Sequence, residues 1–81
     1  MATSAKIQQE RKGFLRAAKR AERKVDTSLE LLEREMARLL LRKRLLDTDD
    51  ANRVALLYRK FYDTLGQLAQ ALTDFTNAVS W

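Results

Sequence analysis

Apolar residues recur at alternating intervals of three and four along the second half of the chain. Flanking positions are apolar as well, at Ala55, Leu57, Tyr62, Ala69, Ala71 and Ala78. Since an α-helix has 3.6 residues per turn, this spacing predicts one long helix with an apolar stripe. The stripe is wider than the seam of a two-stranded coiled coil, which indicates that this helix has neighbours on two sides. The rhythm runs through Ala51, Val54, Tyr58, Phe61, Leu65, Leu68, Leu72, Phe75 and Val79.

The composition leaves little besides helices. The 81 residues include no proline, no cysteine, no histidine and only two glycines, Gly13 and Gly66. A β-sandwich or barrel needs many turns, so the composition argues against those folds. Disulfides and the common zinc ligands are excluded by the missing cysteine and histidine. We therefore expect an all-α protein with a single helical domain spanning residues 1–81.

The first half also follows a helical rhythm, with one irregular step. Phe14, Ala18, Ala21 and Val25 keep the three-four spacing, but the next apolar residue, Leu29, comes four residues later and starts a new frame. This stutter coincides with Thr27 and Glu30, which are spaced as in a capping box. The helix therefore either continues with a stutter or breaks near Thr27. We favour continuity, because no glycine or proline enforces a break and Glu30 can pair with Arg34. The second frame comprises Leu29, Leu32, Met36, Leu39 and Leu46.

A polar segment separates the two rhythms. We predict a first helix over about residues 4–46, a turn at about 47–49 and a second helix over about 50–79. Asp49 and Asp50 then lie in the first turn of the second helix, where they complement its dipole, and 42–44 lie in the last turn of the first. A single continuous helix of about 75 residues, serving as a structural rod, is the competing interpretation.

The predicted fold is a long antiparallel, coiled-coil-like helical hairpin that dimerises into a four-helix bundle. A turn at 47–49 pairs residues whose numbers sum to about 95, which places Val79 near Arg16 and Tyr58 near Ala37, and leaves about the first dozen residues unpaired. Two helices alone provide too small a core, and a second copy supplies the missing neighbours. The predicted self-association core comprises Val54, Tyr58, Phe61, Leu65, Leu68, Leu72 and Phe75.

Positive charge is concentrated in the first half. Residues 1–46 carry 13 Lys and Arg against six Asp and Glu, whereas 47–81 carry three against five. A cationic stripe on a helix suits contacts with phosphates, so nucleic acid is one candidate partner. An anionic membrane surface or an acidic protein is another, and a merely solvated helix face is the third interpretation. The stripe comprises Lys12, Arg16, Lys19, Arg20 and Arg23.

Other residues suggest a site for an unidentified protein. Three consecutive leucines at 39–41 cover more of the helix surface than one neighbour can bury, and Leu56 lies on an otherwise polar face. Trp81 either closes one end of a bundle or anchors a partner. The alternative is that the dimer itself buries these side chains. The candidates for partner binding are Leu40, Leu41, Leu56 and Trp81.

Catalysis has little support. The carboxylates fit helix caps and ion pairs, and Glu-x-x-His metal motifs require histidine. We therefore expect no enzyme activity, no metal and no cofactor, and, from the uncleaved-looking start and lack of a long apolar run, a cytoplasmic protein with no membrane span. The function that the sequence favours is a small protein-binding regulator or adaptor that self-associates. A nucleic-acid-binding regulator using the basic face is the alternative.

Overall fold

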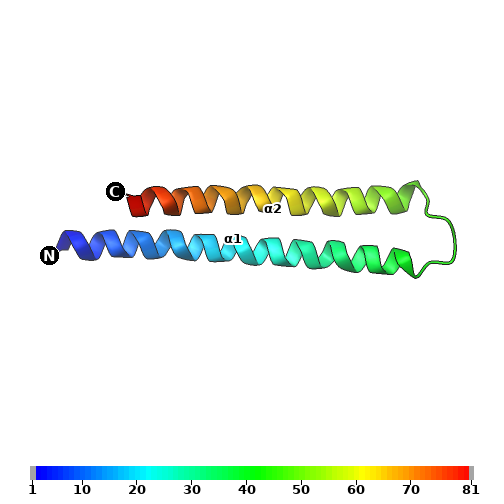
Figure 1. Ribbon diagram of the computed structural model, residues 1–81, viewed down its shortest axis with the longest axis horizontal. Coiled ribbons are helices and arrows are strands. Elements are labelled where there is room, and N and C mark those ends of the chain that lie inside the picture. Colours follow the sequence, from blue (N-terminus) through cyan, green and yellow to red (C-terminus); the bar gives the residue numbers. More distant parts are fainter. Residues whose placement is uncertain (1, 81) are drawn as a thin grey trace.

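Two long antiparallel helices run side by side for most of the chain (Figure 1). In this computed structural model, residues 2–80 are described, with the side chains of residues 6–79. Helix α1 spans Ala2–Leu40 and α2 spans Thr48–Ser80. The particle measures 67 × 15 × 13 Å, whereas a single helix of about 75 residues would approach 110 Å. The predicted all-α hairpin is confirmed, and the rod of one continuous helix is wrong.

Helix α1 continues through the sequence at which a break was considered. The Thr27 hydroxyl donates a hydrogen bond to the Arg23 carbonyl at 3.0 Å, which is a bond within a helix and not a cap. Arg34 donates to Glu30 at 2.8 Å, one turn away. The continuous helix and the Glu30–Arg34 pair are therefore confirmed, and the capping box at Thr27 does not form.

The end of α1 differs from the prediction. The helix ends at Leu40 instead of about residue 46, and the connection occupies 41–47. The amides of Leu41 and Arg42 bond three residues back, to Arg38 and Leu39, which tightens the last turn before the chain leaves the helix. Residues 41–46 have good helix propensity, but the ion pairs that Arg42 and Arg44 make with Asp50 hold the segment in a loop. A tertiary interaction overrides the local preference.

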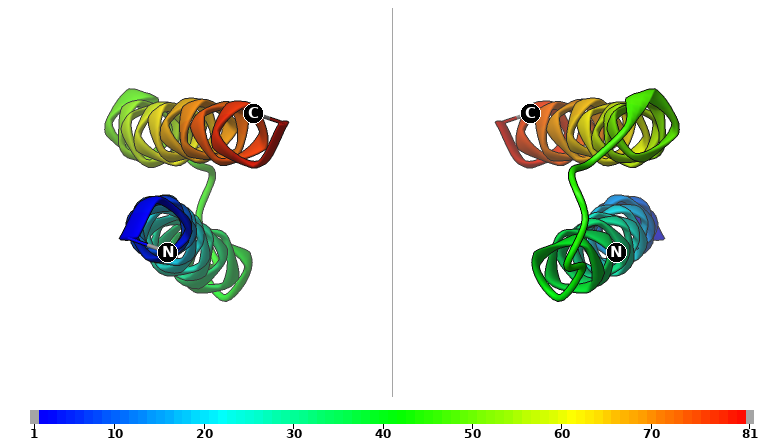
Figure 2. Two further views of the ribbon diagram at one scale, coloured as in Figure 1. Left: turned by 90° about the vertical axis from the view of Figure 1, so that its left-hand side faces the viewer. Right: turned by 90° about the vertical axis from the view of Figure 1, so that its right-hand side faces the viewer.

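The early end of α1 shifts the pairing of the two helices. Arg11 Nη2 donates to the Val79 carbonyl at 3.5 Å, and Arg53 lies 3.8 Å from Glu35. The predicted proximity of Val79 to Arg16 is therefore wrong by about one and a half helical turns. Since the pairing moves toward the N-terminus, α1 extends past α2 by less than the dozen residues predicted. Viewed end-on, the helices are inclined to each other (Figure 2).

The contact between the helices, which we call the seam, has a regular three-four spacing without a stutter. The predicted stutter at Val25 is wrong, because the seam passes through Ser28 and Glu35, polar residues that an apolar pattern does not reveal. On α1 the seam comprises Arg11, Phe14, Ala18, Ala21, Val25, Ser28, Leu32, Glu35 and Leu39. On α2 it comprises Asp50, Val54, Leu57, Phe61, Thr64, Leu68, Ala71, Phe75 and Ala78.

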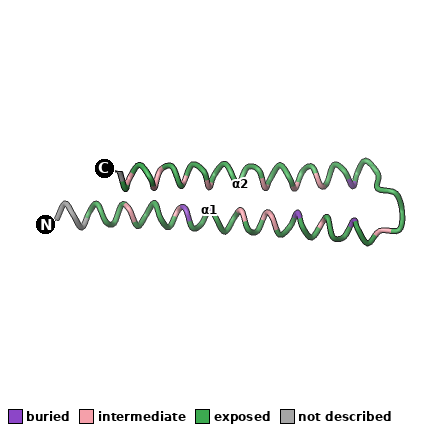
Figure 3. The backbone as a smooth tube through the Cα atoms, in the orientation of Figure 1, coloured by how far each residue is buried: buried purple, intermediate pink, exposed green. Residues whose placement is uncertain are grey.

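The core of this hairpin is thin. Among the described residues, the buried apolar side chains are Ala18, Ala21, Leu32 and Leu39, and no large side chain is fully enclosed. Figure 3 shows most of the buried and partly buried positions along the line between the helices, with a further partly buried position in the connection, at Arg42. Much of the apolar surface that normally stabilises a domain of this size therefore remains exposed.

Replacement of Gly66 by alanine should stabilise the hairpin. Gly66 is exposed within α2, and an added methyl group meets no described atom within 4 Å. Glycine in a helix interior costs about 1 kcal/mol relative to alanine, so Gly66→Ala should raise the melting temperature by about 4–8 °C. Thermal unfolding followed by circular dichroism measures this, with Gln67→Ala as the control that changes no glycine. An unchanged melting temperature for Gly66→Ala would contradict the expectation.

Candidate interaction surfaces

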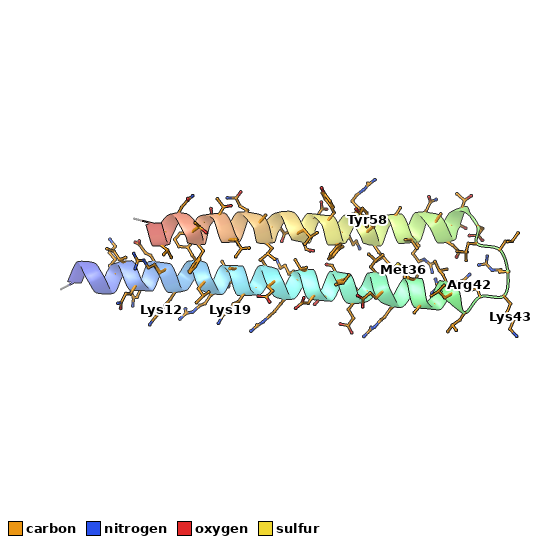
Figure 4. All side chains as sticks on the ribbon, in the orientation of Figure 1. Lys12, Lys19, Met36, Arg42, Lys43 and Tyr58 are labelled. Carbon is orange, nitrogen blue, oxygen red and sulfur yellow. The ribbon has the colours of Figure 1, made fainter. Side chains whose placement is uncertain are left out.

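One side of the hairpin is apolar along its length. On each helix, every second residue of the seam is followed by a residue that lies on this side, and these residues form a row with a spacing of seven. Because the two helices are antiparallel, the row of α1 and the row of α2 lie on the same side of the hairpin. A groove on this side is lined by Leu32, Met36 and Leu39 of α1 and by Val54 and Tyr58 of α2, among others. Met36 and Tyr58 are labelled in Figure 4. We call this side the lateral face: Leu15, Glu22, Leu29 and Met36 on α1, and Ala51, Tyr58, Leu65, Leu72 and Val79 on α2.

The lateral face is substantially exposed. Tyr58 is 54% exposed, Leu72 48% and Met36 43%. Beside them on α2, Tyr62 is exposed too, and its ring centroid lies 6.2 Å from that of Tyr58. Glu22 is the one charged member of the two rows. The face is thus an apolar strip that the hairpin itself does not cover.

The opposite side of the hairpin, the polar face, is lined mainly by charged residues. Thr64 and Ser28 line a shallow depression there together with Arg23 and Lys24. The two sides therefore differ in character, and only one of them offers a continuous apolar surface. Rows flanking the seam on the polar face comprise Glu10, Ala17, Lys24, Leu31 and Arg38 on α1, and Arg53, Lys60, Gln67 and Asp74 on α2.

Glu35 is a charged residue of the seam, and the arginines that bind it, Arg38 and Arg53, lie on the polar face. Its side chain is 11% exposed and accepts a hydrogen bond from Arg38 Nε at 3.1 Å, with Arg38 Nη2 on the other oxygen. Arg53 of α2 approaches to 3.8 Å. The hydrogen bond from Arg38 holds the pKa of Glu35 below its ordinary value, so the carboxylate is ionised at neutral pH. This cluster links the two helices through Arg38 of α1 and Arg53 of α2.

Asp47 and Asp50 close the N-terminus of α2 as a reciprocal cap. The Asp50 amide donates to Asp47 Oδ1 at 2.9 Å, and the Asp47 amide donates to Asp50 Oδ2 at 3.1 Å. This is the geometry of a capping box, with aspartate in place of the usual glutamate. Of the two acidic residues predicted for the first turn of the second helix, Asp50 takes part in this cap, and Asp49 also lies in the first turn.

Two arginines of the connection also bind Asp50, which is buried. Arg42 Nη1 lies 3.3 Å from one carboxylate oxygen and Arg44 Nη1 lies 3.2 Å from the other. The backbone hydrogen bond from Asp47 is the main cause that holds the pKa of Asp50 below its ordinary value, and Arg44 adds to it. Arg42 and Arg44 are thus engaged within the chain, whereas Lys43 points outward (Figure 4).

The leucines around the connection are the most exposed apolar residues described. Leu45 is 93% exposed, Leu40 85% and Leu41 83%. The sequence pointed to Leu40 and Leu41 but missed Leu45, because a helix through residue 46 would have partly covered it. Leu56, the third predicted partner residue, is half exposed on α2, and Trp81 lies outside the described residues. We refer to Leu40, Leu41 and Leu45 as the turn leucines.

The cationic stripe occupies the outer surface of α1. All five of its residues are exposed, and Lys12 and Lys19 extend from the side of α1 that faces away from α2 (Figure 4). Within the described part of the chain, none of the five pairs with a carboxylate at 4.0 Å or less. The structure therefore brings together Lys12, Arg16, Lys19, Arg20 and Arg23 as an available cationic surface.

The predicted self-association core divides between two surfaces. One part lies in the seam of a single hairpin, at Val54, Phe61, Leu68 and Phe75. The other part lies on the lateral face, at Tyr58, Leu65 and Leu72. Sequence periodicity could not separate them, since both rows are apolar and adjacent.

Residues 2–80 contain no group of three or more acidic, histidine or cysteine side chains placed to hold a metal ion. None of the described helices is long and apolar enough to cross a membrane. No protein-family model, curated protein or solved structure matches the chain significantly.

Stability should fall in acid, partly through Asp50. Since the folded-state pKa of Asp50 is depressed, its stabilisation is present above the unfolded value of 3.8 and is lost as the pH falls through the folded value. Asp50→Asn keeps an acceptor for the Asp47 amide but removes the charge. We expect the gap in melting temperature between the two proteins to be widest at neutral pH and to narrow below pH 3.8. Parallel melting profiles between pH 7 and pH 2 would contradict this role.

Proposed function

We propose that this protein is a small non-enzymatic regulator or adaptor, a self-associating helical hairpin that acts by binding another protein. One observation carries the proposal: the hairpin exposes two separate apolar surfaces, the lateral face and the turn leucines, that its own helices do not bury. Exposed apolar areas of this kind mark interaction sites in soluble proteins.

The lateral face supports self-association. It extends along both helices, and each square ångström of apolar surface removed from water stabilises an assembly by about 25 cal/mol. Only four apolar side chains are buried in the described hairpin, so a partner would compensate for a core that is small for the length of the chain. A homodimer built as a four-helix bundle is the arrangement that we propose.

The turn leucines support binding of a second protein. They lie at one end of the hairpin, whereas the lateral face runs along its side, so self-association need not cover them. Leu41 and Leu45 of the connection, with Leu40 at the end of α1, can enter a hydrophobic groove of a partner without unfolding either helix. The ion pairs of Arg42 and Arg44 with Asp50 hold this loop against α2, which lowers the entropy lost on binding.

Substitution of the turn leucines should abolish target binding and preserve the fold. The variant Leu40→Ser/Leu41→Ser/Leu45→Ser is compared with the wild type for proteins retained from a lysate, quantified by mass spectrometry. We expect a specific partner to be depleted by about a hundredfold or more, since each of the three leucines lost from an interface costs about 1 kcal/mol or more. Arg59→Ser, at an exposed position of α2, serves as the control. Equal retention by all three proteins would refute the role of the turn leucines.

A nucleic-acid-binding regulator is the second candidate function. The observation that favours it is the set of five exposed cations on the outer surface of α1, none of them paired with a described carboxylate. Such cations displace condensed counterions from a nucleic-acid backbone. The lateral face and the turn leucines have no part in this alternative.

Binding of duplex DNA by this stripe should depend steeply on salt concentration. Five neutralised phosphates give a slope of about −4.5 for log K against log salt concentration. Reversal of charge at Lys12, Arg16 and Arg20 should reduce the slope by about 2.7, whereas Arg34→Glu, at a residue already paired with Glu30, should have a smaller effect. Fluorescence anisotropy with a labelled duplex measures both. Affinity that survives the triple reversal would exclude the stripe as the DNA-binding surface.

A further inference from the structure

We propose that a second copy of this chain covers the lateral face, with the turns of the two hairpins at opposite ends of the dimer. In this arrangement Leu65 lies at the two-fold axis. The inference rests on the self-association in the proposed function and adds the surface, the orientation and the residue pairs.

The spacing of side chains on the lateral face suits packing against the lateral face of a second chain. Its rows repeat every seven residues, the interval at which helices interlock side chains in a coiled coil. On α2 the row is symmetric about its middle member, Leu65, with Tyr58 and Leu72 seven residues to either side, and Ala51 and Val79 fourteen. A two-fold interface requires a surface that is complementary to itself, and a row symmetric about its centre meets that requirement.

The lateral face is also large enough. The hairpin measures 67 Å by 15 Å, so one side offers on the order of 1,000 Å², against the 800 Å² per partner that a specific interface typically buries. The polar face has the same extent, but its rows are mainly charged, and burial of unpaired charges is costly. Only the lateral face therefore suits a stable dimer.

Charge decides the orientation. Two hairpins can meet face to face with their turns at the same end or at opposite ends. Residues 6–24 carry eight Lys and Arg against two Asp and Glu, whereas residues 25–40 carry two against four. The same-end arrangement gathers both basic segments at one end, where they repel. The opposite-end arrangement puts the two basic segments at opposite ends of the dimer. It sets residues 11–24 of each copy against residues 27–40 of the other, which carry three Asp and Glu against two Lys and Arg.

The opposite-end arrangement defines which residues meet. Helix α2 packs on α2 of the second copy, so Leu65 meets Leu65 and Tyr58 meets Leu72. Helix α1 packs on α1 in the same way, which brings Leu15 to Met36 and Glu22 to Leu29. Glu22 is then the one charged residue in the two rows of the lateral face. Because it meets a leucine of the second copy, its burial weakens association.

The dimer would be bivalent toward the target. Because the turns lie at opposite ends, the two sets of turn leucines are separated by roughly the length of a hairpin, 67 Å. One dimer can therefore hold two target molecules apart at its ends, which is the arrangement of an adaptor or spacer.

Substitutions on the lateral face test which surface is used. The mass from size exclusion with light scattering should be twice 9.4 kDa for the wild type. Tyr58→Ser/Leu65→Ser/Leu72→Ser should weaken dimerisation by roughly a hundredfold or more. Leu31→Ser/Leu56→Ser removes leucines of similar exposure outside the lateral face and should leave the dimer intact. Should the triple variant lose its helix content, Glu22→Leu provides the opposite test, because it should tighten the dimer by roughly tenfold.

Single cysteines test the orientation, since the chain has none of its own. Under oxidation, Leu65→Cys should form a disulfide-linked dimer. Tyr58→Cys and Leu72→Cys should form few disulfides separately but link to each other when mixed. A monomeric wild type would overturn both this inference and the proposed self-association. A dimer that the lateral-face variants do not alter, or one in which the mixed cysteines fail to link, would overturn the inference alone.

Discussion

The buried carboxylate of Asp50 is the interaction on which the geometry of the hairpin depends. It accepts a hydrogen bond from the Asp47 amide, which completes the cap of α2, and it binds Arg42 and Arg44 of the connection. These contacts end α1 at Leu40 and hold the loop against the start of α2. The end of α1 and the start of α2 then fix which residues of the two helices lie opposite each other along the rest of the hairpin, because the helices are straight, antiparallel and in contact (Figure 1).

Polar residues in the seam explain why the hairpin has two different sides. Ser28, Glu35 and Thr64 occupy positions where a coiled coil usually has apolar side chains. Glu35 is satisfied by arginines on the polar face, and this orients the charged rows of both helices toward that side. The apolar rows consequently lie together on the other side, where the hairpin provides no cover for them.

Some charged and apolar side chains of the hairpin have partners within the chain, whereas others are exposed to solvent. Arg34, Arg38, Arg42 and Arg44 form ion pairs, so they stabilise the hairpin and its turn. The five cations of the stripe and the turn leucines make no comparable contact within the described residues. Surfaces left free in this way are where partners of complementary chemistry can bind.

The sequence by itself determined the two helices, their antiparallel association and the Glu30–Arg34 pair, because the three-four rhythm and the acidic segment at 47–50 are local signals. It could not determine which of two adjacent apolar rows on α2 faces α1. Both rows satisfy a helical period, so the pattern favoured Tyr58, Leu65 and Leu72, which the structure places on the lateral face. Only the tertiary structure decided which row of α2 faces α1. The row with Thr64, Ala71 and Ala78 faces α1, because these side chains are smaller than those of the lateral face and because Asp50 binds Arg42 across the turn.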